Sequence, residues 1–162
     1  MNSKLTFLTF SLALMLLGSC TDRTVYSEYR SLPLKGWEAD SVLRYNFCIT
    51  DTLTPYDIII SVRHTQHYRY QNMWLFVTAA DSPTIADSIN MVTDTIEFFL
   101  ADERGRWLGN GYGNTREMPV LYGRQTVFPH SGDYSILIQQ AMRDTCLRGI
   151  SDVGVIIEKS HE

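Results

Sequence analysis

The stretch LRYNFCITDTLTPYDIIISVRH, residues 43–64, decides the fold class. Apolar residues occupy every second position from Leu43 to Ile49 and again from Ile58 to Val62. Successive side chains of a β-strand point to opposite faces, so each run predicts a strand with one buried face. The polar segment between the runs is typical of a turn, and Pro55 cannot donate a hydrogen bond to a ladder. The stretch therefore predicts two short strands joined by a turn.

The alternation recurs along the chain, and no segment predicts a long helix. Residues 86–90 are expected to form one helical turn at most, and residues 141–147 either a helical turn or a continued strand. About eight or nine short strands separated by turns are typical of an antiparallel β-sandwich or barrel. We favour an all-β sandwich, because the second half of the strand at residues 68–77 is apolar on both faces. Trp74 and Phe76 are expected in its core.

The first twenty residues, MNSKLTFLTFSLALMLLGSC, predict export. The apolar run of thirteen residues from Leu5 to Leu17 is shorter than a membrane-spanning helix, which needs about 17–25 residues. It fits the apolar part of a secretory signal, roughly 7–15 residues long. The run ends in Leu17-Gly18-Ser19-Cys20, which resembles the bacterial lipobox. That resemblance implies cleavage before Cys20, a diacylglycerol on its thiol, and a further acyl chain such as palmitate. An ordinary signal peptide with a chance cysteine is the alternative.

The chain is accordingly divided into three parts. Residues 1–19 are the predicted signal peptide, residues 20–41 the lipidated cysteine and its tether, and residues 42–159 the sandwich domain. The 143 residues left after cleavage suffice for one domain with its own core. No later apolar run is long enough to span a bilayer, so we expect lipid anchoring to a membrane. Thr21, not Asp, follows the cysteine, which favours the periplasmic face of the outer membrane.

The charge of the chain disfavours nucleic acid as a partner. The formal charge is −4, and it becomes −5 when the signal peptide, with its single charged residue Lys4, is removed. Binding to nucleic acid relies on clustered Lys and Arg side chains that neutralise phosphates. The two remaining cysteines, Cys48 and Cys146, are candidates for a disulfide in an oxidising compartment, and two separate thiols are the alternative.

No motif in the sequence specifies a reaction. His64 and His67 end a predicted strand, where their odd spacing places them on opposite faces, so we expect polar turn residues and no metal site. The glycine-rich segment 109–113 lacks the Lys-Ser/Thr of a phosphate-binding loop. No elbow or metal-protease signature marks a hydrolase, although a triad or a carboxylate pair assembled in space stays open. We therefore expect no enzymatic activity, no metal and no cofactor.

Aromatic residues offer a binding surface as an alternative. Tyr68 and Tyr70 share a strand face, and Trp107 and Tyr112 flank the glycine-rich loop. Exposed Tyr and Trp rings can stack on sugars, whereas buried ones would only fill the core. Asp-Ser/Thr-apolar tripeptides, of which those at Thr52 and Ser88 fall in predicted loops, are similar to an O-glycosylation acceptor of exported bacterial proteins.

Five ordered segments carry a family resemblance: YRYQNMWLF (68–76), DTIEFFLAD (94–102), GRWLGNG (105–111), GDYSILIQQAMR (132–143) and LRGISDVG (147–154). Together with the lipobox, they resemble the GldH family of gliding-motility lipoproteins over most of the mature chain. The resemblance implies a membrane lipoprotein related to the machinery that moves cell-surface adhesins, and it implies no catalytic residues. Because family members also occur in bacteria that do not glide, it leaves open whether the host glides.

Together these observations predict a lipid-anchored, non-enzymatic structural or assembly component of an envelope complex. Its expected partners are the membrane and other envelope or gliding-type proteins. The alternative is a glycan-binding module that uses Tyr68, Tyr70, Trp107 and Tyr112.

Overall fold

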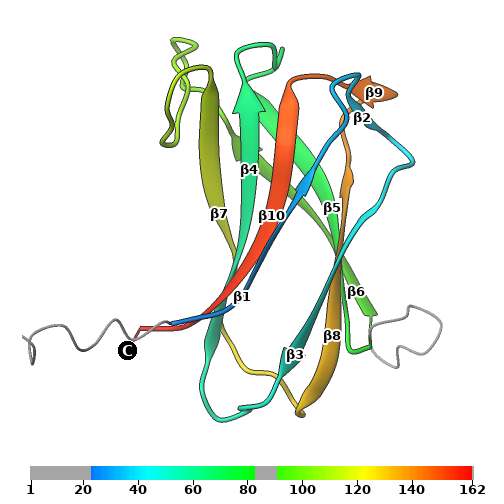
Figure 1. The fold of residues 1–162 in the computed structure, drawn as a ribbon, viewed down its shortest axis with the longest axis vertical. Helices are drawn as coiled ribbons and strands as arrows, with labels where there is room; N and C mark the ends of the chain where they lie inside the picture. The colour runs from blue at the N-terminus through cyan, green and yellow to red at the C-terminus, as the bar shows by residue number, and fades with distance from the viewer. Residues whose placement is uncertain (1–22, 83–90, 162) are drawn as a thin grey trace, which may run out of the picture.

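The protein is an all-β structure in which two four-stranded antiparallel sheets face each other (Figure 1). A computed structural model describes residues 23–82 and 91–161, and the predicted signal peptide, Cys20 and the helical turn expected at 86–90 lie outside these ranges. Within the described ranges there are ten strands and no helix, so the predicted antiparallel sandwich is confirmed.

The first sheet has the strand order β1-β10-β4-β7. Its members are β1 (Thr24–Ser31), β10 (Ile150–Lys159), β4 (Tyr56–Thr65) and β7 (Thr115–Thr126). The first and last strands of the chain are therefore hydrogen-bonded neighbours, with Tyr29 opposite Gly154. This pairing brings residues near 30, 63 and 152 side by side, although they are far apart in the sequence.

The second sheet has the order β3-β8-β5-β6. It is formed by β3 (Leu43–Ile49), β8 (Gly132–Gln140), β5 (Asn72–Ala80) and β6 (Met91–Phe99). A small third sheet pairs β2 (Trp37–Glu38) with β9 (Cys146–Leu147) at one end of the sandwich. Trp37 is fully buried there, and its indole N–H donates to the Ser41 carbonyl at 2.9 Å.

The core lies between the two large sheets and follows the period-two pattern. Every second residue of the central strands is buried, and each such residue contributes roughly 1.5–3 kcal/mol relative to an exposed side chain. The buried members are Tyr45, Phe47, Ile49, Ile58, Ile60, Val62, Met73, Leu75, Val77, Ile136, Ile138, Val153, Val155 and Ile157.

Two sequence-based expectations are corrected by this core. Trp74 and Phe76 lie on the outer face of β5, 36% and 41% exposed, because Met73 and Leu75 face the opposite sheet instead. The sheet also starts at Thr24, inside the stretch that the pattern assigned to the tether. Only two residues, Thr21 and Asp22, therefore separate Cys20 from Arg23, the first described residue.

The sandwich has two ends that differ in their relation to the start of the chain. The near end contains the turns at residues 50–55 and 127–131, and Thr24 lies close to it, paired with Glu158 (Figure 1). The far end, at the top of Figure 1, is where β1 and β4 finish and β5 and β10 begin. The eight residues of β1 span about 25 Å between these levels.

Candidate functional site

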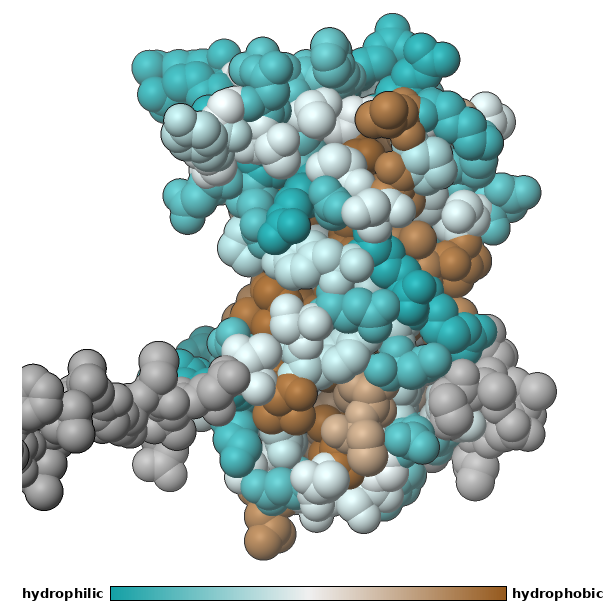
Figure 2. All heavy atoms as spheres, viewed as in Figure 1, coloured by the Kyte–Doolittle hydropathy of each residue, from teal (hydrophilic) through white to brown (hydrophobic). Residues whose placement is uncertain are grey.

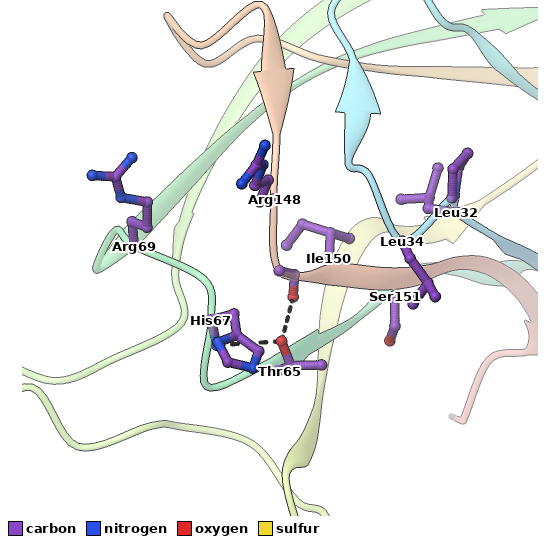
Figure 3. Close-up of a pocket in the computed structure, with 10 residues that line it drawn as sticks. Leu32, Leu34, Thr65, His67, Arg69, Arg148, Ile150 and Ser151 are labelled. Carbon is purple, nitrogen blue, oxygen red and sulfur yellow. Dashed lines mark hydrogen bonds between the residues drawn. The ribbon is translucent and has the colours of Figure 1, made fainter.

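A cavity of about 550 Å³ opens at the far end, between the ends of three neighbouring strands (Figure 3). The segment after β1 lines one side, the loop after β4 a second, and the start of β10 a third. These segments meet because β10 lies between β1 and β4 in the first sheet. The volume lies within the usual range for small-ligand pockets, about 300–1,000 Å³.

The cavity has a cationic side. Arg69 comes from the loop between β4 and β5, and Arg148 comes from the turn between β9 and β10. Both side chains are exposed, and neither forms an ion pair with any residue of the described ranges. His67 adds a third potential cation, and no carboxylate is among the described residues that line the cavity. The chain as a whole has a formal charge of −4, so this cluster of positive charge differs in sign from the protein's net charge.

The opposite side of the cavity is apolar. Leu32, Pro33 and Leu34 follow β1 directly, and in Figure 3 the two leucines lie across from Arg69 and Arg148, with Ile150 between. Figure 2 shows apolar side chains gathered at the upper end, over the segment that follows β1, among largely hydrophilic surroundings.

The hydroxyl groups that line the cavity are hydrogen-bonded to backbone groups. Thr65 lies at the end of β4, and its Oγ1 donates to the Gly149 carbonyl at 3.4 Å and accepts from the His67 N–H at 3.3 Å (Figure 3). The Ser151 hydroxyl donates to the Arg63 carbonyl at 3.2 Å. These bonds hold the loop after β4 against the start of β10, so the cavity wall is supported from within.

A second hollow of about 480 Å³ lies on the other side of the loop that carries Arg69. This groove is lined by Tyr70, Trp74 and Asn72, and by the segment after β8 that contains Met142 and Arg143. The Tyr70 hydroxyl donates to Asp144 at 2.9 Å, and this hydrogen bond, together with burial, raises the pKa of Tyr70. Two adjacent residues of one loop thus line different hollows. Arg69 lines the cavity, and Tyr70 lines the groove.

Three of the four aromatic residues predicted to form a surface, Tyr68, Tyr70 and Trp107, do lie together, but they are buried or partly buried in the domain. Tyr68 is buried, its hydroxyl donates to the Asn72 carbonyl at 2.8 Å, and its ring packs edge-on against Tyr70 at 5.8 Å. Trp107 packs against His64, with ring centroids 4.6 Å apart. Tyr112 stands apart and is 98% exposed. Of the four, only Tyr70 lines either hollow.

His64 is buried, which corrects its expected place as a polar turn residue. Its Nδ1 lies 3.3 Å from the Thr65 carbonyl, whereas its Nε2 has no hydrogen-bond partner within the described structure. Burial lowers the pKa of His64, the hydrogen bond to Thr65 opposes this effect, and the charge of Arg116 adds to it. His67 is exposed and faces the cavity, so the two histidines do point to different environments.

The two cysteines are free thiols, and the candidate disulfide is not formed. Cys48 lies near the end of β3, opposite Asp133, whereas Cys146 lies in β9 at the far end. The Cys146 thiol donates to the Lys35 carbonyl at 3.3 Å. The two residues occupy opposite ends of the sandwich. The candidate disulfide was inferred only from the presence of two cysteines, which does not show how far apart they lie.

In residues 23–82 and 91–161, no helix combines the length and apolarity needed to cross a bilayer. Over the same ranges, no three His, Cys, Asp or Glu side chains are grouped so that they could hold a metal ion.

Sequence reasoning missed the residues that give both hollows their character: Arg69, Arg148, Trp74, Met142 and Arg143. Each falls within a segment that carried the family resemblance, and Arg69 stands between the two tyrosines that were singled out. Strand order brings Arg69 and Arg148 to one cavity, and no local pattern contains that information.

Comparisons with known proteins agree on one family. A family profile described as GldH lipoprotein matches residues 24–157. The chain is 34% identical over 167 aligned residues to a "Gliding motility lipoprotein GldH homolog" of Christiangramia forsetii, covering 99% of both chains. It is 31% identical over 155 residues to the "Gliding motility lipoprotein GldH" of Flavobacterium johnsoniae, covering 91% of this chain and 92% of that one.

Among solved structures, the chain is similar to the VP2 protein of an infectious bursal disease virus subviral particle. The TM-score is 0.35 at 15% identity, and the match covers 84% of this chain but only 30% of the viral protein.

Proposed function

The chain belongs to the GldH lipoprotein family, and from this premise we propose that it is a non-enzymatic assembly component which holds an envelope partner at its far end. In this proposal Cys20 carries the lipid, and the domain stands on the periplasmic face of the outer membrane. Lipid anchoring confines the protein to two dimensions and raises its effective concentration for other membrane-bound proteins.

The observation that carries the proposal is the separation of the start of the domain from its two hollows. Thr24 lies near one end of the sandwich, and both hollows lie at the other, about 25 Å away along β1. Two residues, Thr21 and Asp22, lie between Cys20 and Arg23, and the three Cα–Cα steps from Cys20 to Arg23 span at most about 11 Å. A lipid on Cys20 would therefore keep the near end against the membrane and present the hollows to the periplasm.

The chemistry of the hollows supports a binding role over catalysis. A hydrolase needs a nucleophile within hydrogen-bond reach of a base. In the cavity, the Thr65 and Ser151 hydroxyls are bonded to backbone carbonyls. Arginine is instead among the residue types that are enriched at contact surfaces between proteins.

Site-specific photo-cross-linking in native membranes tests the proposal. A photoreactive residue replaces either Tyr112, at the far end, or Leu53, in the exposed turn at the near end. We expect Tyr112 to yield discrete adducts, identified by mass spectrometry as envelope proteins of the gliding type, and Leu53 to yield lipid or no protein adducts. Equal protein adducts from both positions, or none from Tyr112, would rule out a role for the far end.

Glycan binding is a second candidate function, favoured by the groove around Trp74. An exposed indole ring next to Tyr70, with the Asn72 amide and the Arg143 guanidinium in the same lining, combines a stacking surface with hydrogen-bond donors for sugar hydroxyls. Tryptophan fluorescence titrated with peptidoglycan fragments and lipopolysaccharide oligosaccharides would detect it. Binding should be lost in Trp74→Ala and kept in Tyr112→Ala, since Tyr112 lies outside the groove. Absence of any titratable change would reject this function.

A further inference from the structure

We propose that the cavity between Arg69 and Arg148 binds a peptide segment of a partner protein that carries a carboxylate next to an apolar side chain. The inference rests on the proposed function, because it names the ligand chemistry of the far end. It concerns the cavity alone and makes no use of the groove around Trp74.

The cationic side of the cavity selects the charge of the ligand. Two exposed guanidinium groups without ion pairs in the described structure lie in a chain whose formal charge is −4. Asp152, the residue that follows Ser151 of the lining, accepts a hydrogen bond from the Ser31 hydroxyl at 2.6 Å and forms no ion pair with either arginine. A planar guanidinium fork matches a carboxylate with two parallel hydrogen bonds.

The apolar side narrows the ligand further. Leu34 is fully exposed and Pro33 is exposed beside it, while Ile150 forms the buried floor. Covering such residues removes apolar area from water, and this burial favours binding. A free inorganic anion would leave this wall uncovered. A sugar is also a poor fit, because Tyr, Trp and Phe rings are missing from the described lining of the cavity. A carboxylate adjoining an aliphatic side chain occupies both walls.

The position of the cavity favours a protein over a lipid as the source of the anion. Headgroups of the membrane that holds Cys20 would lie at the near end, whereas the cavity lies beyond the last residue of β1. Its volume of about 550 Å³ accommodates a few residues of an extended segment but not a folded domain. The ligand is therefore a protruding terminus or loop of a neighbouring protein.

Fluorescence anisotropy on the mature lipoprotein in phosphatidylcholine nanodiscs tests the inference. The probe is a fluorescein-labelled peptide ending in Leu-Asp-Leu-Asp with a free carboxyl terminus. We expect saturable binding, at least tenfold weaker binding of the amidated Leu-Asn-Leu-Asn peptide, and similarly weaker binding of Ser-Asp-Ser-Asp. Phosphatidic-acid vesicles form a separate arm, and Arg69- and Arg148-dependent binding of vesicles without peptide binding would overturn the proposal in favour of a lipid.

Matched variants locate the binding. Each hydrogen-bonded guanidinium is worth roughly tenfold in affinity, so Arg69→Gln with Arg148→Gln should weaken the peptide by about a hundredfold. Arg104→Gln with Arg124→Gln makes the same charge change at exposed positions outside the cavity and should stay within about twofold. Leu34→Ser should weaken Leu-Asp-Leu-Asp but not Ser-Asp-Ser-Asp, whereas Leu53→Ser at the near end should change neither. An equal loss of peptide affinity in the two double variants would show that the peptide does not bind in the cavity.

The cross-linking experiment separates this inference from the proposed function. Far-end adducts that persist in the Arg69→Gln, Arg148→Gln protein, with no peptide binding to wild type, would reject the cavity and keep the assembly role. If the Arg69→Gln, Arg148→Gln protein loses both the far-end adducts and peptide binding, the result supports the assembly role and the cavity as the binding site. Thermal unfolding serves as a folding control, and we expect an unchanged midpoint, since neither arginine is ion-paired in the described structure.

Discussion

The guanidinium carbon of Arg63 lies 3.9 Å from the centre of the Tyr29 ring, on the outer face of the first sheet. Both side chains also bind Glu117: the Tyr29 hydroxyl donates to Oε1 at 2.5 Å, and Arg63 Nε donates to Oε2 at 3.0 Å. Ser61 donates to the same Oε1 at 2.7 Å. One carboxylate therefore joins β1, β4 and β7, and it lies on β7, the last member of the strand order β1-β10-β4-β7.

Glu117→Gln should reduce the stability of the domain. Burial alone would raise the pKa of Glu117, but hydrogen bonds from Tyr29, Ser61 and Arg63 outweigh it and lower the pKa. The amide cannot replace these charge-assisted bonds. Because the site is partly exposed, solvent screening limits the expected loss to about 1 kcal/mol in urea unfolding. Glu103→Gln, in an exposed turn, is the control and should unfold like wild type. Identical midpoints for both variants would contradict the role of Glu117.

Gly154→Ala tests the contact beneath Tyr29. A Cβ atom at Gly154 would lie 2.6 Å from ring carbons of Tyr29, so the ring must move off Arg63 and Glu117. We expect a loss of about 1–3 kcal/mol. In a Tyr29→Ala background the obstacle is gone, and the same change should cost at least about 1 kcal/mol less. A double-mutant cycle by urea unfolding measures the difference, and additive losses would show that the ring is not what the alanine displaces.

His64 should make the free energy of unfolding fall as the pH drops below the usual histidine pKa of 6.5. The folded-state pKa lies below the usual value of 6.5, so the unfolded chain binds more protons at pH values between the two. The stabilising contribution of neutral His64 is fully present above pH 6.5 and is lost as the pH falls toward the folded-state pKa, with a slope of at most about 1.4 kcal/mol per pH unit. Urea unfolding of wild type and His64→Gln at several pH values measures it. Parallel curves for the two proteins would refute this assignment.

The free thiols predict insensitivity to reductant. With Cys48 and Cys146 at opposite ends of the sandwich, denatured mature protein should react with two equivalents of a thiol reagent without prior reduction, since the Cys20 thiol would carry the proposed lipid. The unfolding midpoint should be the same with and without dithiothreitol. A midpoint that falls on reduction would mean that the cysteines pair after all.

Cys20→Ala should release a folded protein from the membrane. Without the thiol no diacylglycerol can be attached, and no apolar run of spanning length follows in the sequence. Cell fractionation together with labelled fatty acid measures both effects, and the circular dichroism of the purified variant should match wild type. Ser19→Ala is a suitable control, since it leaves the cysteine and a small residue before it. Membrane association that survives in Cys20→Ala would refute the lipid anchor.

Local alternation predicted the fold wherever one face of a strand is plainly apolar. In β3, Tyr45, Phe47 and Ile49 are buried as the pattern predicts, and Arg44 and Asn46 alternate with them. In β5 both faces are apolar, so alternation could not say whether Leu75 or Trp74 faces the core. That choice depends on how β5 packs against the opposite sheet, which a single strand does not encode.

The candidate site was less predictable because it is assembled from distant segments. Leu32, Arg69 and Arg148 line one cavity although more than a hundred positions separate the first from the last. Their meeting depends on β10 inserting between β1 and β4, a crossover that period and turn chemistry do not specify. His64 was misjudged for the same reason, since Trp107, which packs against its ring, arrives from a loop forty positions later.

With the proposed lipid on Cys20, the short link to Arg23 would make the sandwich a spacer that holds the cavity at a nearly constant height above the membrane. A long, flexible linker would let the cavity move through a wide volume, whereas the two residues between Cys20 and Arg23 would keep the start of the domain close to a bilayer that holds the proposed lipid. A partner that binds in the cavity would then have to lie at a matching height above the membrane. Lengthening the link with glycine and serine would loosen this vertical alignment without altering a single contact in the cavity.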